Sequence, residues 1–235
     1  MKLNKGNHKR IYTILSLMCL CCGVCHAEYN HELGLSGGTA FYLGDANHIT
    51  PFNRPKWTAG AFYRYNIDTR WAVKLDVNYA KVEGDTRDFG YILPNGQEYA
   101  RFERGFVDIQ AAVEFNFFDI GENSYYKSKI DATPYILLGL GLCAYNDLYG
   151  GSSMYEFSIP FAIGGKWKIN KRLTLGIQWS INKLFTDKFD VTNENNKILN
   201  NPTGSPKVGF LDTDFYSLAN ISLSVNLFDT KKFCR

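Results

Sequence analysis

The sequence predicts an all-β fold, a transmembrane antiparallel up-and-down β-barrel of about eight strands. Three observations predict it. Apolar and polar residues alternate with a period of two along several segments, these segments are ten or more residues long, and the connections between them alternate between tight turns and long polar loops. Each element is considered below in chain order.

The first 27 residues have the three parts of a secretory signal peptide. A basic start is followed by an apolar run, and Cys25-His26-Ala27 offers a small-x-small cleavage site. The run ends near Val24 and is shorter than the roughly 20 residues of a membrane-spanning helix, which disfavours an uncleaved anchor. A lipoprotein start at Cys22 or Cys25 is another alternative, although Val24 fits a lipobox poorly. We expect residues 1–27 to be a signal peptide, 28–228 a barrel and 229–235 a periplasmic tail.

The charge balance changes when this segment is removed. Its four basic residues leave 22 Lys and Arg against 23 Asp and Glu, so nothing global indicates a nucleic-acid partner. The remaining cysteines are Cys143 and Cys234, and the remaining histidines are His31 and His48. Two cysteines make no disulfide framework, and this set makes no His/Cys metal cluster. We expect no cofactor and no metal.

Eight segments carry strand signals. The alternation is cleanest over 71–79, 107–117, 173–182 and 219–227, where one face is aliphatic or aromatic and the other polar. Segments 31–43, 56–66, 132–145 and 155–169 are rich in glycine, aromatic and aliphatic residues and complete the set. No segment after the signal peptide has the pattern of an amphipathic helix.

The connections predict a direction. Residues 66–69 and 169–172 form tight turns, whereas 44–55, 84–101, 146–153 and 187–213 are longer and polar. Outer-membrane barrels have short periplasmic turns and longer outer loops, so we expect both termini in the periplasm of a protein of the cell outer membrane. The connection 119–131 is long for a periplasmic turn.

A soluble β-sandwich also alternates, so charges and aromatic residues have to decide. Aromatic residues lie towards strand ends, as in interfacial girdles: Trp57, Tyr65, Trp71, Phe115, Phe117, Trp167 and Phe228. Polar faces carry charges of both signs in mid-strand: Glu32, Arg64, Lys74, Asp76, Asp108, Glu114 and Lys166. The interior of a barrel of about eight strands is only wide enough for its own side chains, so these charges should fill the lumen and pair there. A general porin is therefore disfavoured.

No catalytic constellation stands out. Gly139-Leu140-Gly141 is a small-residue stretch inside a strand and no phosphate loop. Asp212 and Asp214 are paired carboxylates expected to be solvated on a loop, and His48 lacks a matching Ser or Asp pattern. We expect no enzymatic activity.

The first strand carries a family resemblance. The stretch from His31 to Asn47 follows the pattern E-x-G…GG…YxGD-x-N and resembles the opening of PorG-like outer-membrane proteins of Bacteroidota. The matching residues are Glu32, Gly34, Gly37, Gly38, Tyr42, Gly44, Asp45 and Asn47. The sequence Arg64-Tyr-Asn-Ile67 at the first tight turn also fits.

This resemblance implies a component of the type IX protein secretion system. PorG-like proteins are associated with the periplasmic ring of the PorK lipoprotein and PorN, so a PorK-like and a PorN-like protein are the implied partners, besides outer-membrane lipids. The chain would dock or anchor that ring without forming the main conduit. The alternative is a stand-alone small barrel of the OmpA or OmpX kind, serving adhesion or envelope stability, and an outer-membrane enzyme is a third.

The predicted direction separates the two cysteines. Cys143 would lie roughly 28 Å from the periplasmic end and Cys234 in the tail, too far apart to pair with each other. An unpaired cysteine on an exported tail suggests an intermolecular disulfide, with the PorK-like protein as the partner that the resemblance supplies. A free thiol at Cys234 is the equal alternative. The long connection, with Tyr125, Tyr126, Lys127 and Lys129, is a second candidate contact surface.

Overall fold

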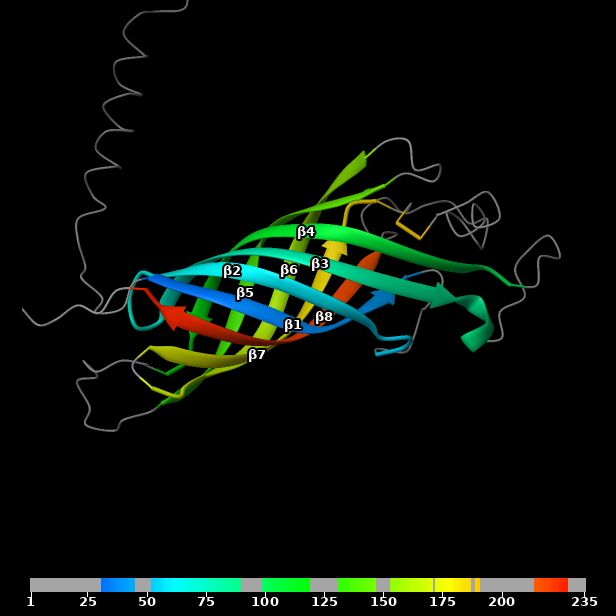
Figure 1. Cartoon of the computed structure of the whole chain (residues 1–235). Coiled ribbons are helices and arrows are strands. Elements are labelled where there is room, and N and C mark those ends of the chain that lie inside the picture. Colours follow the sequence, from blue (N-terminus) through cyan, green and yellow to red (C-terminus); the bar gives the residue numbers. More distant parts are fainter. Residues whose placement is uncertain are drawn as a thin grey trace, which may run out of the picture.

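A computed structural model describes residues 31–44, 52–89, 99–118, 131–146, 153–170, 172–186, 189–190 and 214–227. Within these ranges eight strands form one closed antiparallel barrel in chain order (Figure 1), so the predicted fold class is confirmed. The strands are β1 (His31–Leu43), β2 (Lys56–Asn66), β3 (Trp71–Asp85), β4 (Arg101–Asn116), β5 (Ala132–Asn146), β6 (Ser153–Lys168), β7 (Leu173–Leu184) and β8 (Phe215–Asn226). The described part of the chain contains no helix long and apolar enough to cross a membrane. The predicted signal peptide and tail lie outside the described residues.

The barrel is closed by the pairing of β1 with β8. Residues Glu32 to Leu43 pair with Asn226 to Phe215 along nearly the whole of both strands. The ladder of paired residues that starts at His31 runs once round the barrel and returns to β1 at Phe41, ten residues further along. Such a stagger tilts the strands against the barrel axis and fixes a narrow interior.

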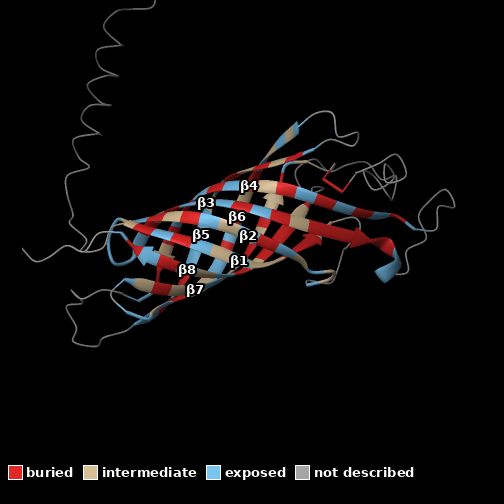
Figure 2. Ribbon diagram, in the orientation of Figure 1, coloured by how far each residue is buried: buried red, intermediate tan, exposed pale blue. Residues whose placement is uncertain are grey.

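The two faces of the barrel differ in the way that the alternation predicts. Buried and exposed residues alternate along the strands and make the chequered pattern of Figure 2. Large apolar side chains are exposed on the outside, among them Leu35 at 69% and Leu140 at 70%. Polar and charged side chains are buried inside. A soluble protein rarely exposes so much apolar surface, and this inside-out arrangement is that of a transmembrane barrel, with lipid as its outer solvent.

Two strands run further than the alternation predicts. β3 continues to Asp85 and β4 begins at Arg101, so their last five residue pairs, from Lys81 and Gly105 onwards, extend past the pairing of β2 with β3 and of β4 with β5. This β3–β4 ribbon projects from the end opposite the tight turns and ends in the short 3-10 helix η1 (Thr86–Phe89) (Figure 1). The regular pattern fails there because charged residues of the ribbon pair with one another and are partly buried.

The seam between β1 and β8 needs a glycine at one of two adjacent positions. A Cβ on Gly38 would overlap the carbonyl oxygen of Ala219 and lie 2.8 Å from the Cα of Asn220, and backbone atoms cannot move aside without opening the seam. A Cβ on Gly37 would have as its nearest neighbour the carbonyl oxygen of Thr58, at 3.9 Å. The two glycines therefore form a matched pair.

We expect Gly38→Ala to lower the free energy of unfolding by about 1–3 kcal/mol, the usual cost of overpacking, and Gly37→Ala to leave it unchanged or slightly higher. The measurement is urea unfolding of refolded protein in lipid vesicles, followed by tryptophan fluorescence. Equal stability of the two variants would refute the close-approach role of Gly38.

Candidate functional site

The candidate site is the interior of the barrel, because its charged groups are buried there. Each strand contributes a polar side chain to the half nearest the tight turns: Glu32, Arg64, Lys74 with Asp76, Glu114, Tyr135, Lys166, Gln178 and Ser224, from β1 to β8 in order. These residues occupy the inward face because they fall on the polar half of each alternation. We call this group the lumen network.

Arg64 is the centre of the lumen network. Its side chain is 2% exposed, and its Nη1 donates to Glu32 Oε2 at 2.8 Å. Its Nε lies 3.2 Å from Glu114 Oε2, an ion pair whose angles do not make a hydrogen bond. Lys166 pairs with the other oxygen of Glu114. The guanidinium thus bridges carboxylates from β1 and β4, and such a fork suits Arg better than Lys.

Glu32 is held by two neutral donors as well. Asn66 donates to its Oε1 at 2.8 Å, and the Ser224 hydroxyl donates to its Oε2 at 3.0 Å. Because Ser224 belongs to the last strand and Glu32 to the first, this contact crosses the closing seam.

A second chain of contacts crosses the lumen beside the first. The ammonium group of Lys74 lies 3.0 Å from Asp76 and donates to Gln178 Oε1 at 2.9 Å, and the Tyr135 hydroxyl donates to the same oxygen at 3.0 Å. The ring of Phe62 lies between the two chains, with Lys74 Nζ 4.5 Å and the Arg64 Cζ 5.1 Å from its centroid. Cations over an aromatic face gain further stabilisation in a site that excludes water.

An uncharged layer follows along β4. Asp108 accepts a hydrogen bond from Gln110, which also donates to Asn182 Oδ1 at 2.8 Å. Asn182 in turn donates to Ser180 Oγ at 3.2 Å. Asp108 is fully buried and belongs to this layer, apart from the ion pairs around Arg64.

Aromatic rings fill the lumen at the end where the long loops lie. Phe189, from the connection after β7, is fully buried there. Its ring centroid is 5.2 Å from that of Phe106, 5.3 Å from that of Tyr145 and 6.0 Å from that of Tyr216. Together with Tyr42, these rings form what we call the aromatic plug.

The prediction that Asp214 is solvated is wrong. It is 1% exposed because the plug covers it, and its Oδ1 accepts a hydrogen bond from the Tyr42 hydroxyl at 2.5 Å. Its Oδ2 accepts from the backbone N–H of Phe189 at 3.0 Å. Tyr42 also lies 2.9 Å from Asp190 Oδ2. Asp214 therefore ties the connection after β7 to β1 and is a structural residue of the plug.

Charged residues also order the outer rim. Phe52 and Arg54 both have positive φ, at 66° and 47°, so the chain turns sharply before β2. Arg54 Nε and Nη2 donate to the two oxygens of Asp88 at 2.7 and 3.0 Å, and Nη1 donates to Glu83 at 2.6 Å. This clamp joins the chain before β2 to the β3–β4 ribbon.

Hydrogen bonds from Arg54 and Asn53 lower the pKa of Asp88 from its ordinary 3.8 to about 2. A carboxylate with a lowered pKa contributes stability above its ordinary pKa and loses that contribution as the pH falls through the lowered value. The clamp therefore stays ionised in all but strongly acidic solution.

The remaining sequence candidates lie in two kinds of place. Cys143 is fully buried and carries a free thiol within the described residues. Cys234, together with Tyr125, Tyr126, Lys127 and Lys129, lies outside the described residues. Alternation did not reveal Phe62, Phe189 or Tyr42 as parts of the filled lumen, although the inward parity of Phe62 and Tyr42 was a usable signal.

The residues of the first-strand motif now have physical explanations. Glu32 accepts the Arg64 hydrogen bond, and Gly34 leaves room for the Phe62 ring, which a Cβ would overlap. A Cβ on Gly44 would overlap Tyr42 and lie 2.7 Å from Asp214 Oδ1. The motif therefore describes how the lumen is packed, while Asp45 and Asn47 lie outside the described residues.

Comparisons with known proteins give one family and several distant structures. The family described as "Domain of unknown function (DUF6089)" matches residues 9–235, and no curated protein matches. Among solved structures, Neisserial surface protein A has 11% identity and a TM-score of 0.46, covering 84% of this chain and 97% of that one. OprG from Pseudomonas aeruginosa has 10% identity and a TM-score of 0.44, covering 85% and 97%. Likenesses this weak carry no argument about function.

We expect Arg64→Ala to lower the free energy of unfolding by about 3–5 kcal/mol, because Glu32 and Glu114 stay buried without the guanidinium between them. Arg64→Lys keeps the charge without the fork and should fall in between. The measurement is denaturant unfolding in vesicles, with Glu103→Gln at the exposed rim as a control expected within about 0.5 kcal/mol of the unmodified protein. An Arg64→Ala barrel as stable as this control would contradict the bridging role.

Proposed function

The chain belongs to the family described as "Domain of unknown function (DUF6089)", and since that description assigns no activity, we propose from the geometry that the protein is a non-conducting outer-membrane barrel that holds partners at its ends. The observation that carries this proposal is the filled lumen. Ion pairs around Arg64, the amide layer and the aromatic plug follow one another along β4.

The membrane assignment is supported by the outer surface. Its exposed side chains are leucine, isoleucine, valine and aromatic residues over all eight strands. Closed barrels that span membranes this way belong to outer membranes, where no strand edge is left open to lipid. The start of β1 and the end of β8 lie beside each other, with the Leu227 N–H donating to the His31 carbonyl at 2.9 Å, and we assign this end to the periplasm.

A closed lumen moves function from the interior to the two ends. In this proposal the periplasmic end docks or anchors a ring formed by PorK-like and PorN-like proteins of a type IX secretion system. The support is the resemblance of residues 31–47 to PorG-like proteins. Cys234 and the contact surface at Tyr125, Tyr126, Lys127 and Lys129 would lie at that end. No group of the lumen network is given a catalytic role.

A second function is favoured by the opposite end. The Arg54 clamp holds the chain before β2 against the β3–β4 ribbon, so the outer rim presents an ordered, charged surface. A stand-alone barrel serving adhesion or envelope stability would use such a surface. The two functions need different ends, so they can be separated by experiment.

We expect vesicles that contain the purified barrel to show no swelling in small sugars and no steady conductance in planar bilayers, because side chains occupy the lumen. The double variant Phe62→Ala/Phe189→Ala removes one ring from each half and should conduct more than the unmodified protein. Porin-like conductance of the unmodified barrel would overturn the proposal.

We expect deletion of the gene to abolish secretion of many surface proteins, and reintroduction of the unmodified gene to restore it. Affinity purification from cross-linked membranes should recover PorK-like and PorN-like proteins. Normal secretion with altered adhesion would reject the docking role and favour the stand-alone barrel.

The tether at Cys234 has its own readout. Non-reducing gels should show a higher-mass band that Cys234→Ser removes, with Cys143→Ser as the matched control that keeps it. An unchanged band pattern in Cys234→Ser would rule out the disulfide, while docking through Lys127 and Lys129 would be tested by their joint change to alanine.

A further inference from the structure

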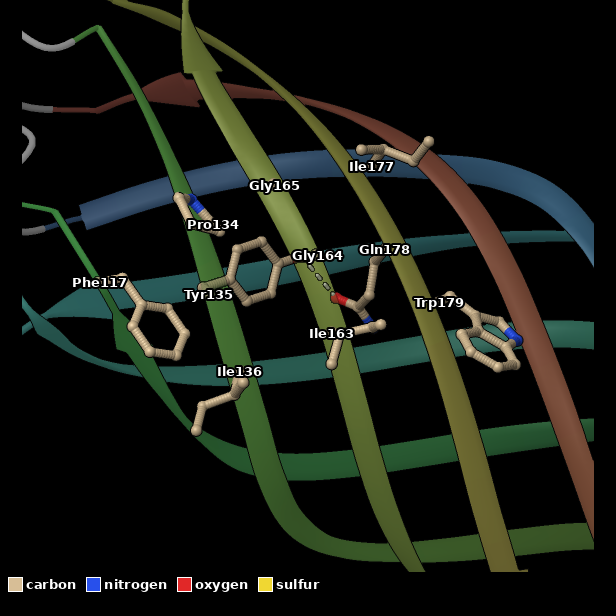
Figure 3. Close-up of a pocket in the computed structure, with 10 residues that line it drawn as sticks. All are labelled: Phe117, Pro134, Tyr135, Ile136, Ile163, Gly164, Gly165, Ile177, Gln178 and Trp179. Atoms are coloured by element: carbon tan, nitrogen blue, oxygen red, sulfur yellow. Dashed lines mark hydrogen bonds between the residues drawn. The ribbon is translucent and has the colours of Figure 1, made fainter.

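The outer face of the barrel has a depression over β5, β6 and β7. Its volume is about 430 Å³, within the range of small-ligand sites. Figure 3 shows Gly165 of β6 in its floor, between Pro134 of β5 and Ile177 of β7. These three residues are register partners on adjacent strands, so the missing side chain lies in the middle of the depression. The apolar rim includes Phe117, Ile136, Ile163 and Trp179.

Packing explains the glycine next to it and leaves Gly165 without a structural reason. A Cβ on Gly164, which faces the lumen, would lie 2.5 Å from Tyr135 Cζ and 2.6 Å from the Ile177 carbonyl oxygen. A Cβ on Gly165 would meet Ile177 and the Thr133 carbonyl oxygen at 3.9 Å, which is ordinary contact. Glycine weakens a strand interior, and where the fold does not need it, close approach of a ligand is the usual reason.

The position of the depression indicates what approaches. Gly165 lies three residues from the end of β6, next to the tight turn between β6 and β7. Trp167, 56% exposed, stands at the same end, where aromatic side chains mark the membrane interface. The depression therefore begins just below the headgroups of one leaflet and faces the acyl chains.

Charge at the adjacent rim favours an anionic headgroup. Lys168 ends β6, and Arg172 is an exposed residue of the turn that follows. Asp131, before β5, is the acidic residue beside them among those described, and its backbone carbonyl accepts the Lys168 N–H at 2.7 Å. Basic residues at this level attract anionic lipid.

We propose that this depression binds one phospholipid with an anionic headgroup, its acyl chain lying over Gly165 and its phosphate beside Lys168 and Arg172. The site rests on the transmembrane fold and is independent of any role in secretion. An acyl chain fits because the lining is apolar and open along its length to the bilayer. A bulky side chain at position 165 would occupy the same space.

The test uses Trp179, which lines the depression, as the reporter. The full-length barrel with Trp57, Trp71 and Trp167 changed to Phe is placed in phosphatidylcholine vesicles, and fluorescence quenching by phospholipids with brominated acyl chains is titrated. We expect brominated phosphatidylglycerol to reach half-maximal quenching at about a tenfold lower mole fraction than brominated phosphatidylcholine. Identical curves for the two lipids would overturn the proposal.

Two matched variants locate the effect. Gly165→Leu fills the depression and should remove the preference, whereas Gly37→Leu, at an outward glycine of β1 with open space around it, should keep it. Lys168→Gln/Arg172→Gln should bring the two lipids to equal quenching without preventing it. A preference that survives Gly165→Leu, or that Gly37→Leu also removes, would overturn the site. Folding is checked by gel mobility without boiling, and Gly165→Ala replaces the leucine variant if that fails to fold.

Discussion

The bridge that Arg64 makes between Glu32 and Glu114 is the contact on which the interior depends. Eight strands enclose too little space for water to solvate separate charges, and a buried charge without a partner costs several kcal/mol. The guanidinium, 2% exposed, meets carboxylates from β1 and β4 and leaves the second oxygen of Glu114 for Lys166. Neutralisation is thus shared across β1, β2, β4 and β6, and the barrel becomes a solid body.

The glycines of the first strand follow from that interior. Gly34 is small because the Phe62 ring lies against it, and that ring separates Arg64 from Lys74. Gly44 is small because Tyr42 and Asp214 meet beside it to hold the aromatic plug. The residues that carry the resemblance to PorG-like proteins are therefore those that pack the lumen. A partner would have to be recognised by residues outside this motif.

The barrel could be predicted from the sequence because its cause is local. Alternation within one strand decides which side chains face inward, so the placement of Arg64 and Glu114 inside needs only their parity. The partners of each charge depend on register between strands, and the alternation does not contain it. Asp214 was placed wrongly because Phe189, from a distant part of the connection, covers it. The depression at Gly165 was missed because an empty space leaves no mark in the residues that border it.

The contact between Ser224 and Glu32 has a consequence for how the barrel is made. The two residues come from the last and the first strand, so Glu32 acquires its full set of donors only when the chain is complete. An unclosed sheet would carry both open edges and an incompletely paired carboxylate, which hydrocarbon does not tolerate. Insertion and closure are therefore coupled, and the nascent sheet needs water or an assembly machine at its open side until β8 arrives.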